Sequence, residues 1–298
     1  MIIKDWVKKS LYTMAPPVFD KELSVSTSYI FHTERIYERA IFDRLIRFCK
    51  QYRTLTGEKA ICVLMTPNNP LVAHGRKQHQ VDEVEYLARA HELAEIATLG
   101  YHGHFWTDPQ NLVPSSEMKG EHFLEAAFKS QFESDLQWFE KSGISHQGAY
   151  SGGWWFMNRP VLRSLIQSNF SADFSFSYAK SFQNPYSIDL MRKNEISVGA
   201  PFRVQYLEKK MVCIQNFIGC HPSPFLGDFV RNFNRLVRNA NPPMIGVLNS
   251  HDYDLDDYHT LKCIEMLIHT RQFKWMSYEN LTRLSNSRCQ KTVILDES

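Results

Sequence analysis

Short apolar runs alternate with amphipathic segments along almost the whole chain. Residues 59–66 form a continuous apolar run of the kind found in a strand that is buried on both faces. Residues 38–52, 81–100 and 121–143 instead repeat apolar side chains at helical spacing, and the last two segments end in a glycine. Strands that alternate with helices of about 10–20 residues predict βαβ units around a parallel sheet.

The same alternation continues to the end of the chain and gives six or seven strand–helix units. No linker rich in proline, glycine or serine divides them, and there is no internal repeat. The pattern therefore predicts one α/β barrel domain over residues 23–298, after an N-terminal extension of residues 1–22. Further strands are predicted within residues 23–34, 101–106, 146–155, 172–177, 211–220 and 244–255, further helices within residues 161–169, 227–240 and 258–270, and a last strand and helix within residues 274–286.

The first residues favour a surface helix rather than a membrane span. Apolar side chains between Ile3 and Met14 lie near helical spacing with lysines between them. This pattern predicts a helix packed on the domain, with weak contact to a membrane surface as the alternative. No apolar run reaches the roughly 18 residues of a spanning helix, and the N-terminus lacks the apolar segment of a signal peptide. Because Cys62 also lies in an apolar run, we expect a cytoplasmic protein with reduced thiols.

Composition and short motifs narrow the classes of function. The chain of 298 residues has a formal net charge of +2 and no basic stripe, so nucleic-acid binding is not expected. It has no C-x-x-C pair, G-x-S-x-G elbow or phosphate-binding glycine loop, which argues against zinc–thiolate, serine-hydrolase and nucleotide sites. Aromatic residues make up 13% of the chain, a share that suits a packed core and also the faces of sugars.

A barrel of parallel strands restricts where chemistry occurs. Active residues lie at the carboxyl ends of the strands, where loops lead into helices. The unusual polar and aromatic residues of this chain gather at those predicted ends. They are His32, Thr33, Glu34, His102, His104, Ser151, Gly152, Gly153, Trp154, Trp155, Asp173, His251, Asp252 and Asp254.

The segment His102-Gly103-His104 is the strongest of these clusters. Residues two apart on an extended strand share a face, so both imidazoles can point the same way. Two imidazole nitrogens can bind a divalent metal, and a third ligand from another strand end would leave positions open for water. The alternative is a pair of histidines that make ordinary hydrogen bonds in a loop or in the core.

Glu34 and His251 are the other candidates for chemistry. Glu34 follows an apolar strand and can bind metal or act as a base, or it can belong to a charged helix start with Thr33 as the N-cap. His251 lies beside carboxylates and can act as a general acid, with Asp252 or another carboxylate fixing its tautomer. The alternative for His251 is a solvated loop histidine.

Residues 151–155, Ser-Gly-Gly-Trp-Trp, combine small backbone positions with two indoles. Glycine lets a ligand approach the backbone, and indole faces stack on the C–H surfaces of sugars. The alternative is a tight turn with both indoles packed inward.

The order of these segments resembles the polysaccharide deacetylase family, the carbohydrate esterases with a NodB-type domain. The likeness covers about residues 23–284 and depends on four segments in sequence order. Residues 29–34 lie where the family has its first motif, residues 99–104 resemble the histidine motif, residues 149–155 resemble a groove loop, and residues 246–251 resemble the closing histidine segment.

The resemblance implies a deformed (β/α) barrel of about seven parallel strands and a metal-dependent hydrolase. Such an enzyme removes an N- or O-acetyl group from a sugar or from a surface-polysaccharide precursor, as in lipopolysaccharide biosynthesis. His102, His104 and Glu34 would hold a divalent metal, expected to be zinc, with Glu34 also serving as the base and His251 protonating the leaving group. The residues expected to border the carbohydrate are Ser151, Gly153, Trp154, Trp155 and Asp173.

The chain also departs from the family pattern in three places. His32, Thr33 and Glu34 replace the paired aspartates of the first motif, Trp106 occupies the usual position of the second metal histidine, and Ser151 replaces a groove arginine. These departures support a second hypothesis, a glycan-binding or scaffold protein on the same fold without turnover. A third hypothesis is a barrel hydrolase that acts on a non-sugar amide.

Overall fold

A computed structural model describes residues 24–110, 113–114, 124–178, 185–217, 230, 233–234, 244–256 and 258–296. The predicted N-terminal extension with its surface helix lies outside these residues. Most of the predicted helix at residues 227–240 lies outside them as well. Within the described part of the chain, no helix is both long and apolar enough to cross a membrane.

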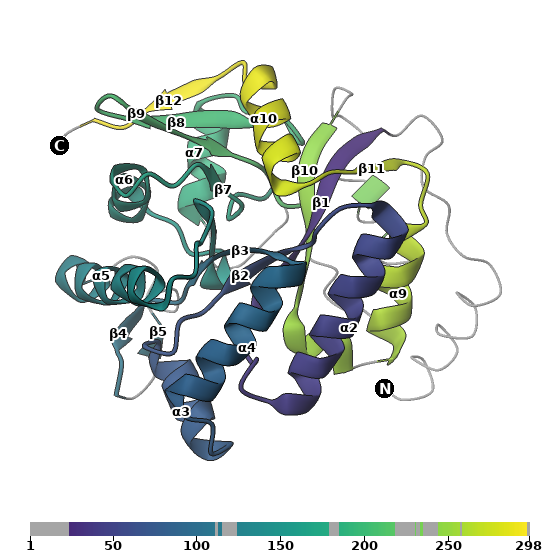
Figure 1. Ribbon diagram of the computed structural model, residues 1–298. Coiled ribbons are helices and arrows are strands. Elements are labelled where there is room, and N and C mark those ends of the chain that lie inside the picture. Colours follow the sequence, from purple (N-terminus) through teal and green to yellow (C-terminus); the bar gives the residue numbers. More distant parts are fainter. Residues whose placement is uncertain are drawn as a thin grey trace, which may run out of the picture.

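The centre of the fold is a sheet of parallel strands (Figure 1). Its neighbours follow the order β10-β1-β2-β3-β6-β7-β9, and each adjacent pair in that series is parallel. This finding confirms the predicted α/β class with about seven parallel strands. The strands are β1 (Val25–Thr33), β2 (Ile61–Leu64), β3 (Thr98–Gly103), β6 (Ala149–Gly152), β7 (Ala172–Asp173), β9 (Lys209–Cys213) and β10 (Met244–His251).

The barrel is deformed because its sheet does not close through a full ladder. Among the described residues, a single bridge joins the segment just after β9 to β10, from Asn216 to Val247. The Phe217 N–H donates to the Val247 carbonyl at 2.8 Å, and the Val247 N–H donates to the Gln215 carbonyl at 2.9 Å. The residues that follow β9 thus meet β10 around Val247 without forming a ladder.

Five further short strands in the described part of the chain either extend this sheet or form a separate pair. β8 (Phe202–Tyr206) runs antiparallel to β9, and β12 (Thr292–Ile294) pairs with β8. β11 (Phe273–Trp275) pairs with the first residues of β1, while β4 (Trp106–Asp108) and β5 (Val113–Pro114) form a separate pair. The hydrophobic pattern predicted β11 but not β4, β5, β8 or β12.

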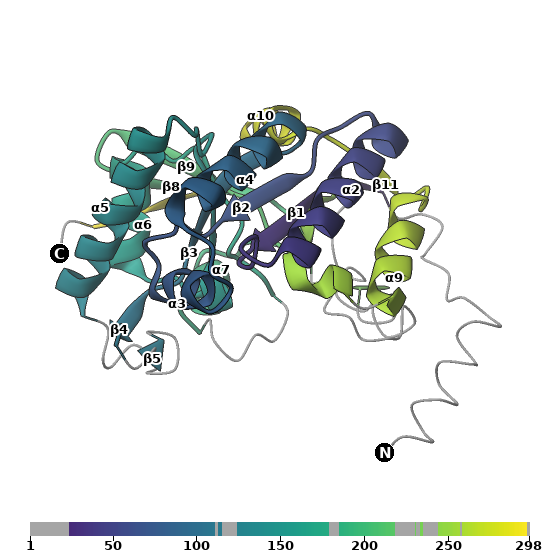
Figure 2. The same ribbon diagram turned by 60° about the horizontal axis from the view of Figure 1, so that its bottom comes forward.

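Helices cover the outside of the sheet, and α2 and α9 lie side by side in both views (Figure 1, Figure 2). Side-chain caps begin several of them: Asn69, Asp82, Asn158 and Ser277 each accept a backbone N–H of the first turn. The helices are α2 (Arg39–Thr56), α3 (Pro70–Gln78), α4 (Glu83–Ile96), α5 (Glu125–Ser142), α6 (Arg159–Gln167), α7 (Pro185–Lys193), α9 (Tyr258–Ile268) and α10 (Tyr278–Arg288), with short 3-10 turns η2 (Gly153–Trp155) and η3 (Asp252–Asp256).

One predicted helix boundary is wrong. The helical pattern at residues 81–100 was expected to end at Gly100, but α4 ends at Ile96 and β3 begins at Thr98. Gly100 instead faces the neighbouring strands: a Cβ there would lie 2.8 Å from Val63 Cγ1 and 2.9 Å from Ala149 Cβ. Its small size is needed for packing inside the barrel and not for a helix cap.

Alternation along the strands divides the core into two clusters. On β1, Tyr29 and Phe31 belong to the cluster under the helices, whereas Ile30 belongs to a second cluster inside the barrel. Tyr278 of α10 joins the inner cluster and shares a hydrogen bond of 2.5 Å with Ser171, just before β7, so α10 covers the amino ends of the strands. The inner cluster comprises Ile30, Ile61, Val63, Ala149, Ala172, Phe174, Val212, Ile214, Ile245, Val247, Tyr278 and Leu281.

Candidate functional site

The inward-facing positions turn from apolar to polar at the carboxyl ends of the strands. His32 comes two residues after Ile30 on β1, and Ser151 comes two residues after Ala149 on β6. The same step of two leads from Gly100 to His102 on β3. Each polar side chain therefore lies on the inner face, one step above the inner cluster.

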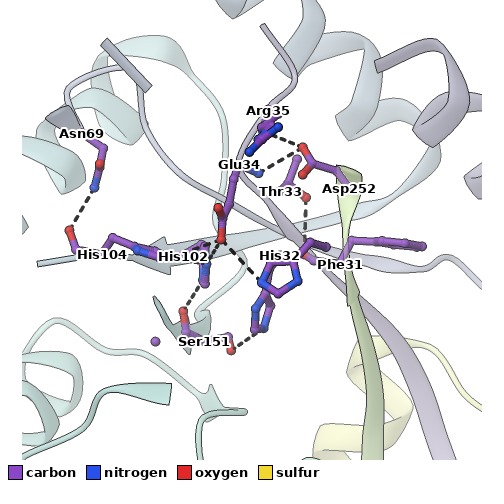
Figure 3. A network of polar contacts seen from close by, with 12 residues as sticks. Phe31, His32, Thr33, Glu34, Arg35, Asn69, His102, His104, Ser151 and Asp252 are labelled. Atoms are coloured by element: carbon purple, nitrogen blue, oxygen red, sulfur yellow. Dashed lines mark hydrogen bonds and ion pairs between the residues drawn. The ribbon is translucent and has the colours of Figure 1, made fainter. Parts of the chain in front are cut away.

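Three buried side chains meet at this end of the barrel (Figure 3). Glu34 Oε1 lies 3.3 Å from His102 Nε2 and 3.2 Å from His104 Nε2, and the two Nε2 atoms are 3.0 Å apart. Ligands about 2.0–2.1 Å from one metal ion lie roughly 3.0–3.4 Å from each other in octahedral or tetrahedral geometry. The three ligand atoms thus have the spacing that a divalent ion requires.

The protonation states of these groups also suit a metal. Burial is the main cause that lowers the pKa of His102, to about 4, so the ring is neutral. Its Nδ1 lies 2.7 Å from the Ser151 carbonyl oxygen and donates to it, which leaves the Nε2 lone pair directed at the cluster. Burial alone would raise the pKa of Glu34, but His104 and His102 bring it well below the usual range, so Glu34 is a carboxylate.

His251 lies at the edge of the same cluster. Its Nε2 is 3.7 Å from Glu34 Oε1, and its Nδ1 is 3.4 Å from Asp254 Oδ2. Burial works to lower the pKa of His251, but Asp254 and Glu34 outweigh it and the pKa is raised. Asp254 is therefore the carboxylate that orients this ring, whereas Asp252 accepts the backbone N–H groups of Glu34 at 3.0 Å and Arg35 at 2.6 Å.

His32 occupies the middle of the site, where the sequence indicated only a replaced aspartate. Its ring stacks on His102 with centroids 4.4 Å apart and meets His251 edge-on at 5.2 Å. Its Nε2 lies 3.0 Å from Ser151 Oγ. Burial is the main cause that lowers its pKa well below the usual value, so the ring is neutral. Strand alternation could have predicted this inward position, because His32 follows Ile30 by two residues and Ile30 faces the inside of the barrel.

No model of a known protein family matches the chain, and no curated protein sequence matches it. Several solved structures do align with the chain. A protein from Mycobacterium smegmatis that is assigned to the polysaccharide deacetylases aligns over 95% of this chain and 98% of its own, with a TM-score of 0.58 at 10% identity. The chain has the polysaccharide deacetylase fold. The 4-α-glucanotransferase of Thermococcus litoralis also aligns, over 91% of this chain and 40% of its own, with a TM-score of 0.50 at 9% identity.

The two neighbours carry names for different reactions, so the polysaccharide deacetylase fold alone does not decide the chemistry. The site has to decide it. The structure also shows where Trp106 lies, the residue that occupies the usual position of the second metal histidine in the family pattern. His104 lies beside His102 in the cluster, whereas Trp106 donates its Nε1–H to Asn69 Oδ1 at 3.2 Å and does not enter the cluster.

The Gly-Gly-Trp-Trp loop packs against the cluster. Gly153 has no room for a side chain, because a Cβ there would lie 2.0 Å from His104 Cδ2. Trp154 and Trp155 both have φ in the left-handed region, at 49° and 58°, where non-glycine residues are uncommon. Their rings contact site histidines, Trp154 with His104 at 4.0 Å between centroids and Trp155 with His32 at 5.1 Å.

Asp173 is the predicted site residue that the structure does not bring to the cluster. Its neighbours Ala172 and Phe174 face the inside of the barrel, so Asp173 faces the other way. It accepts hydrogen bonds from Ser175 at Oδ1 and Oδ2, at 2.6 Å and 3.2 Å. Ser175 Oγ in turn accepts the Gly152 N–H at 2.8 Å. Asp173 therefore reaches the site only through the backbone of the loop.

Proposed function

We propose that this protein is a metal-dependent hydrolase that removes an acetyl group from a carbohydrate. The observation that supports it best is the spacing of Glu34 Oε1, His102 Nε2 and His104 Nε2 at the carboxyl ends of the strands. A divalent ion bound there supplies Lewis acidity that polarises an acyl carbonyl and favours deprotonation of water. Two imidazoles with one carboxylate suit zinc.

The hydrolysis needs two proton transfers, one from the attacking water and one to the leaving group, and we assign them to two different side chains. Because Glu34 Oε1 lies between the imidazoles of His102 and His104, where it would hold the ion, we assign the proton of the attacking water to the second oxygen of the same carboxylate. We assign to His251 Nε2 the proton that the leaving amine or alcohol requires. Asp254 holds the opposite side of that ring and keeps Nε2 directed at the cluster.

The carbohydrate would lie against the Ser151–Trp155 loop. Trp154 and Trp155 are partly exposed and border the histidines, so their indole faces are available to a sugar ring. Ser151 contacts His32 and Gly153 lies against His104, and Asp173 supports the loop through Ser175 and Gly152. A precursor of a surface polysaccharide, as in lipopolysaccharide biosynthesis, is the substrate class that we propose.

We further propose that the protein works in the cytoplasm. The four cysteines whose side chains the structure describes are all free, and three of them are buried. Free thiols in this number are typical of a reducing compartment.

The test measures metal and product together. Purified wild type is expected to hold about one zinc per chain, by elemental analysis, and to release acetate from N-acetylglucosamine oligomers or O-acetylated sugars. His102→Ala is expected to lose both properties. His91→Ala, which removes an exposed histidine of α4, is the matched control and should keep both.

Two results would contradict the proposal. The first is wild-type protein that holds no metal after zinc addition and releases no acetate from any sugar in the panel. The second is an acetylated glycan that binds equally well with and without chelator and is never turned over. That second result would establish the glycan-binding hypothesis instead.

A further inference from the structure

His104 is the ligand whose backbone the sheet does not hold. β3 ends at Gly103, and its register with β6 ends at the pair Gly103–Gly152. His104 therefore lies one residue past the ladder, where a loop would ordinarily move more than a strand. His102, in contrast, is inside β3 and pairs with Ser151. Something other than strand pairing has to fix His104.

Two side-chain amides from other elements bind the His104 backbone carbonyl. Asn69 Nδ2 donates to this oxygen at 2.9 Å (Figure 3), and Gln131 Nε2 of α5 donates to it at 2.5 Å. The carbonyl thus uses both of its acceptor positions. These bonds come from residues 35 and 27 positions away in the chain, so they tie His104 to two separate parts of the fold.

The orientation of the Asn69 amide is determined by its other partners. Its Oδ1 accepts the Leu71 N–H at 3.1 Å, which caps α3, and the Trp106 Nε1–H at 3.2 Å. Since both partners are donors, this end of the amide is the oxygen, and the NH₂ end faces the His104 carbonyl. Asn69 is only 1% exposed, so water does not compete for these positions.

Gln131 is held in a similar way from the other side. Asp135, one turn later on α5, accepts hydrogen bonds from Gln131, from Thr66 just after β2, and from the Tyr101 hydroxyl at 2.7 Å. The Gln131 amide is therefore held by a buried polar network, as the Asn69 amide is held by Leu71 and Trp106. On the imidazole side of His104, Gly153 and Trp154 close the remaining space.

We propose that Asn69 is a positioning residue for the metal ligand His104, with Gln131 as the second donor. The proposal rests on the proposed function, because it takes the Glu34–His102–His104 cluster to be a metal site. Residues that orient a ligand without touching the ion typically change metal affinity by about 10- to 100-fold when they are replaced. His104 needs such support because it lacks the ladder that holds His102.

The test compares zinc and cobalt dissociation constants of matched variants by competition with a chromophoric chelator. Asn69→Asp keeps an acceptor for the Leu71 and Trp106 N–H groups but loses the donor to His104. Asn69→Ser keeps a helix cap and adds no charge. Both are expected to raise the dissociation constant about 10- to 100-fold and to change the visible spectrum of the cobalt form. Gln131→Met, which removes the second donor on another helix, should act in the same direction.

Asn68→Ser is the matched control. Asn68 is the neighbouring asparagine, is exposed, and binds Ser134 of α5 through Nδ2 at 3.1 Å without touching His104. It should leave metal affinity unchanged within about threefold, and thermal unfolding of the metal-free proteins will show that each variant is folded.

The outcomes separate the two proposals. If wild type binds no zinc, the metal site and this inference both fail. If wild type binds zinc and Asn69→Asp, Asn69→Ser and Gln131→Met bind it equally tightly, only the positioning role fails. The same holds if Asn68→Ser weakens zinc as much as they do. Selective weakening in the Asn69 and Gln131 variants, with unchanged unfolding temperatures of the metal-free proteins, supports the positioning role.

Discussion

The inside of the barrel has two levels that come from the same strands. At the lower level Ile30, Val63 and Val247 pack with Phe174 and are covered by α10. At the upper level the same inner faces present imidazoles and Ser151, with Glu34 added from the loop after β1. One step of two residues along a strand separates a dry hydrocarbon cluster from a buried polar one.

The difference shows how stability and chemistry are divided in this fold. The lower level removes apolar surface from water and stabilises the barrel by roughly 25 cal/mol for each Å² buried. The upper level buries a carboxylate with several histidines, which is unfavourable unless every group is paired or bound to a metal. Changes at the lower level should therefore reduce stability, and changes at the upper level should reduce metal binding.

The largest expected effect comes from the lower level. Phe174→Ala removes a ring that is fully buried in the inner cluster, with its centroid 6.3 Å from that of Tyr278. We expect the free energy of unfolding to fall by about 3–5 kcal/mol, measured by chemical denaturation. Zinc affinity of the folded fraction should stay within about threefold of wild type.

If Phe174→Ala does not accumulate as folded protein, Ile30→Val provides the milder form of the same test. Its expected loss is about 0.5–1.5 kcal/mol, again without a change in zinc affinity. A large loss of zinc affinity in either folded variant would show that the two levels are not separate.

The next effect comes from the contact between the loop and the ligand. Gly153→Ala places a Cβ against the His104 ring, which has no space for it. We expect zinc affinity to fall about 100-fold, which corresponds to about 2.7 kcal/mol, in the same chelator competition. The His104 ring cannot accept this Cβ without a shift, because the Trp154 ring also contacts it, with the centroids 4.0 Å apart.

Gly143→Ala is the control for a general effect of replacing glycine. Gly143 ends α5 with φ of 70°, and a Cβ there would meet nothing within 4 Å. It should reduce the free energy of unfolding by about 1 kcal/mol and leave zinc affinity unchanged. Equal zinc affinities in Gly153→Ala and wild type would show that His104 does not need its observed position.

The hydrophobic pattern predicted much of the lower level. Continuous apolar runs such as Ile61–Leu64 are buried on both faces, and the step of two between His102 and His104 correctly indicated that they meet. Sequence alone could not predict that His104 lies beyond the strand and is fixed by Asn69. That bond joins residues 35 positions apart, and no local pattern encodes it.

Local patterns also failed where tertiary packing decides the outcome. Gly100 was predicted to end a helix, because glycine is common just after the last helical residue. In the structure it lies inside the barrel, where Val63 and Ala149 leave no space for a larger side chain. The family resemblance placed Asp173 beside the carbohydrate, yet its neighbours Ala172 and Phe174 face the inside of the barrel and Asp173 faces the other way. The register of a two-residue strand cannot be deduced from so short a pattern.

The last expected effect, smaller than that of Phe174→Ala, concerns Asp135, which supports the upper level from outside the barrel. Burial raises the pKa of this carboxyl from 3.8 to about 6, although Thr66, Tyr101 and Gln131 donate hydrogen bonds to it. The folded chain therefore keeps this proton at pH values where the unfolded chain has lost it. Consequently, the free energy of unfolding decreases as the pH rises from about 4 to about 6 and remains lower above that range.

Asp135→Asn removes this titration while keeping a side chain of the same size. Between pH 4 and pH 8 the wild type should lose about 1–3 kcal/mol more of its free energy of unfolding than the variant does. Denaturant titrations of both metal-free proteins across that range measure the difference, and groups that titrate in both proteins cancel. Parallel pH profiles would mean that Asp135 is ionised without penalty in the folded chain. The network behind His104 would then be open to water, which the burial of Asp135, Thr66 and Tyr101 argues against.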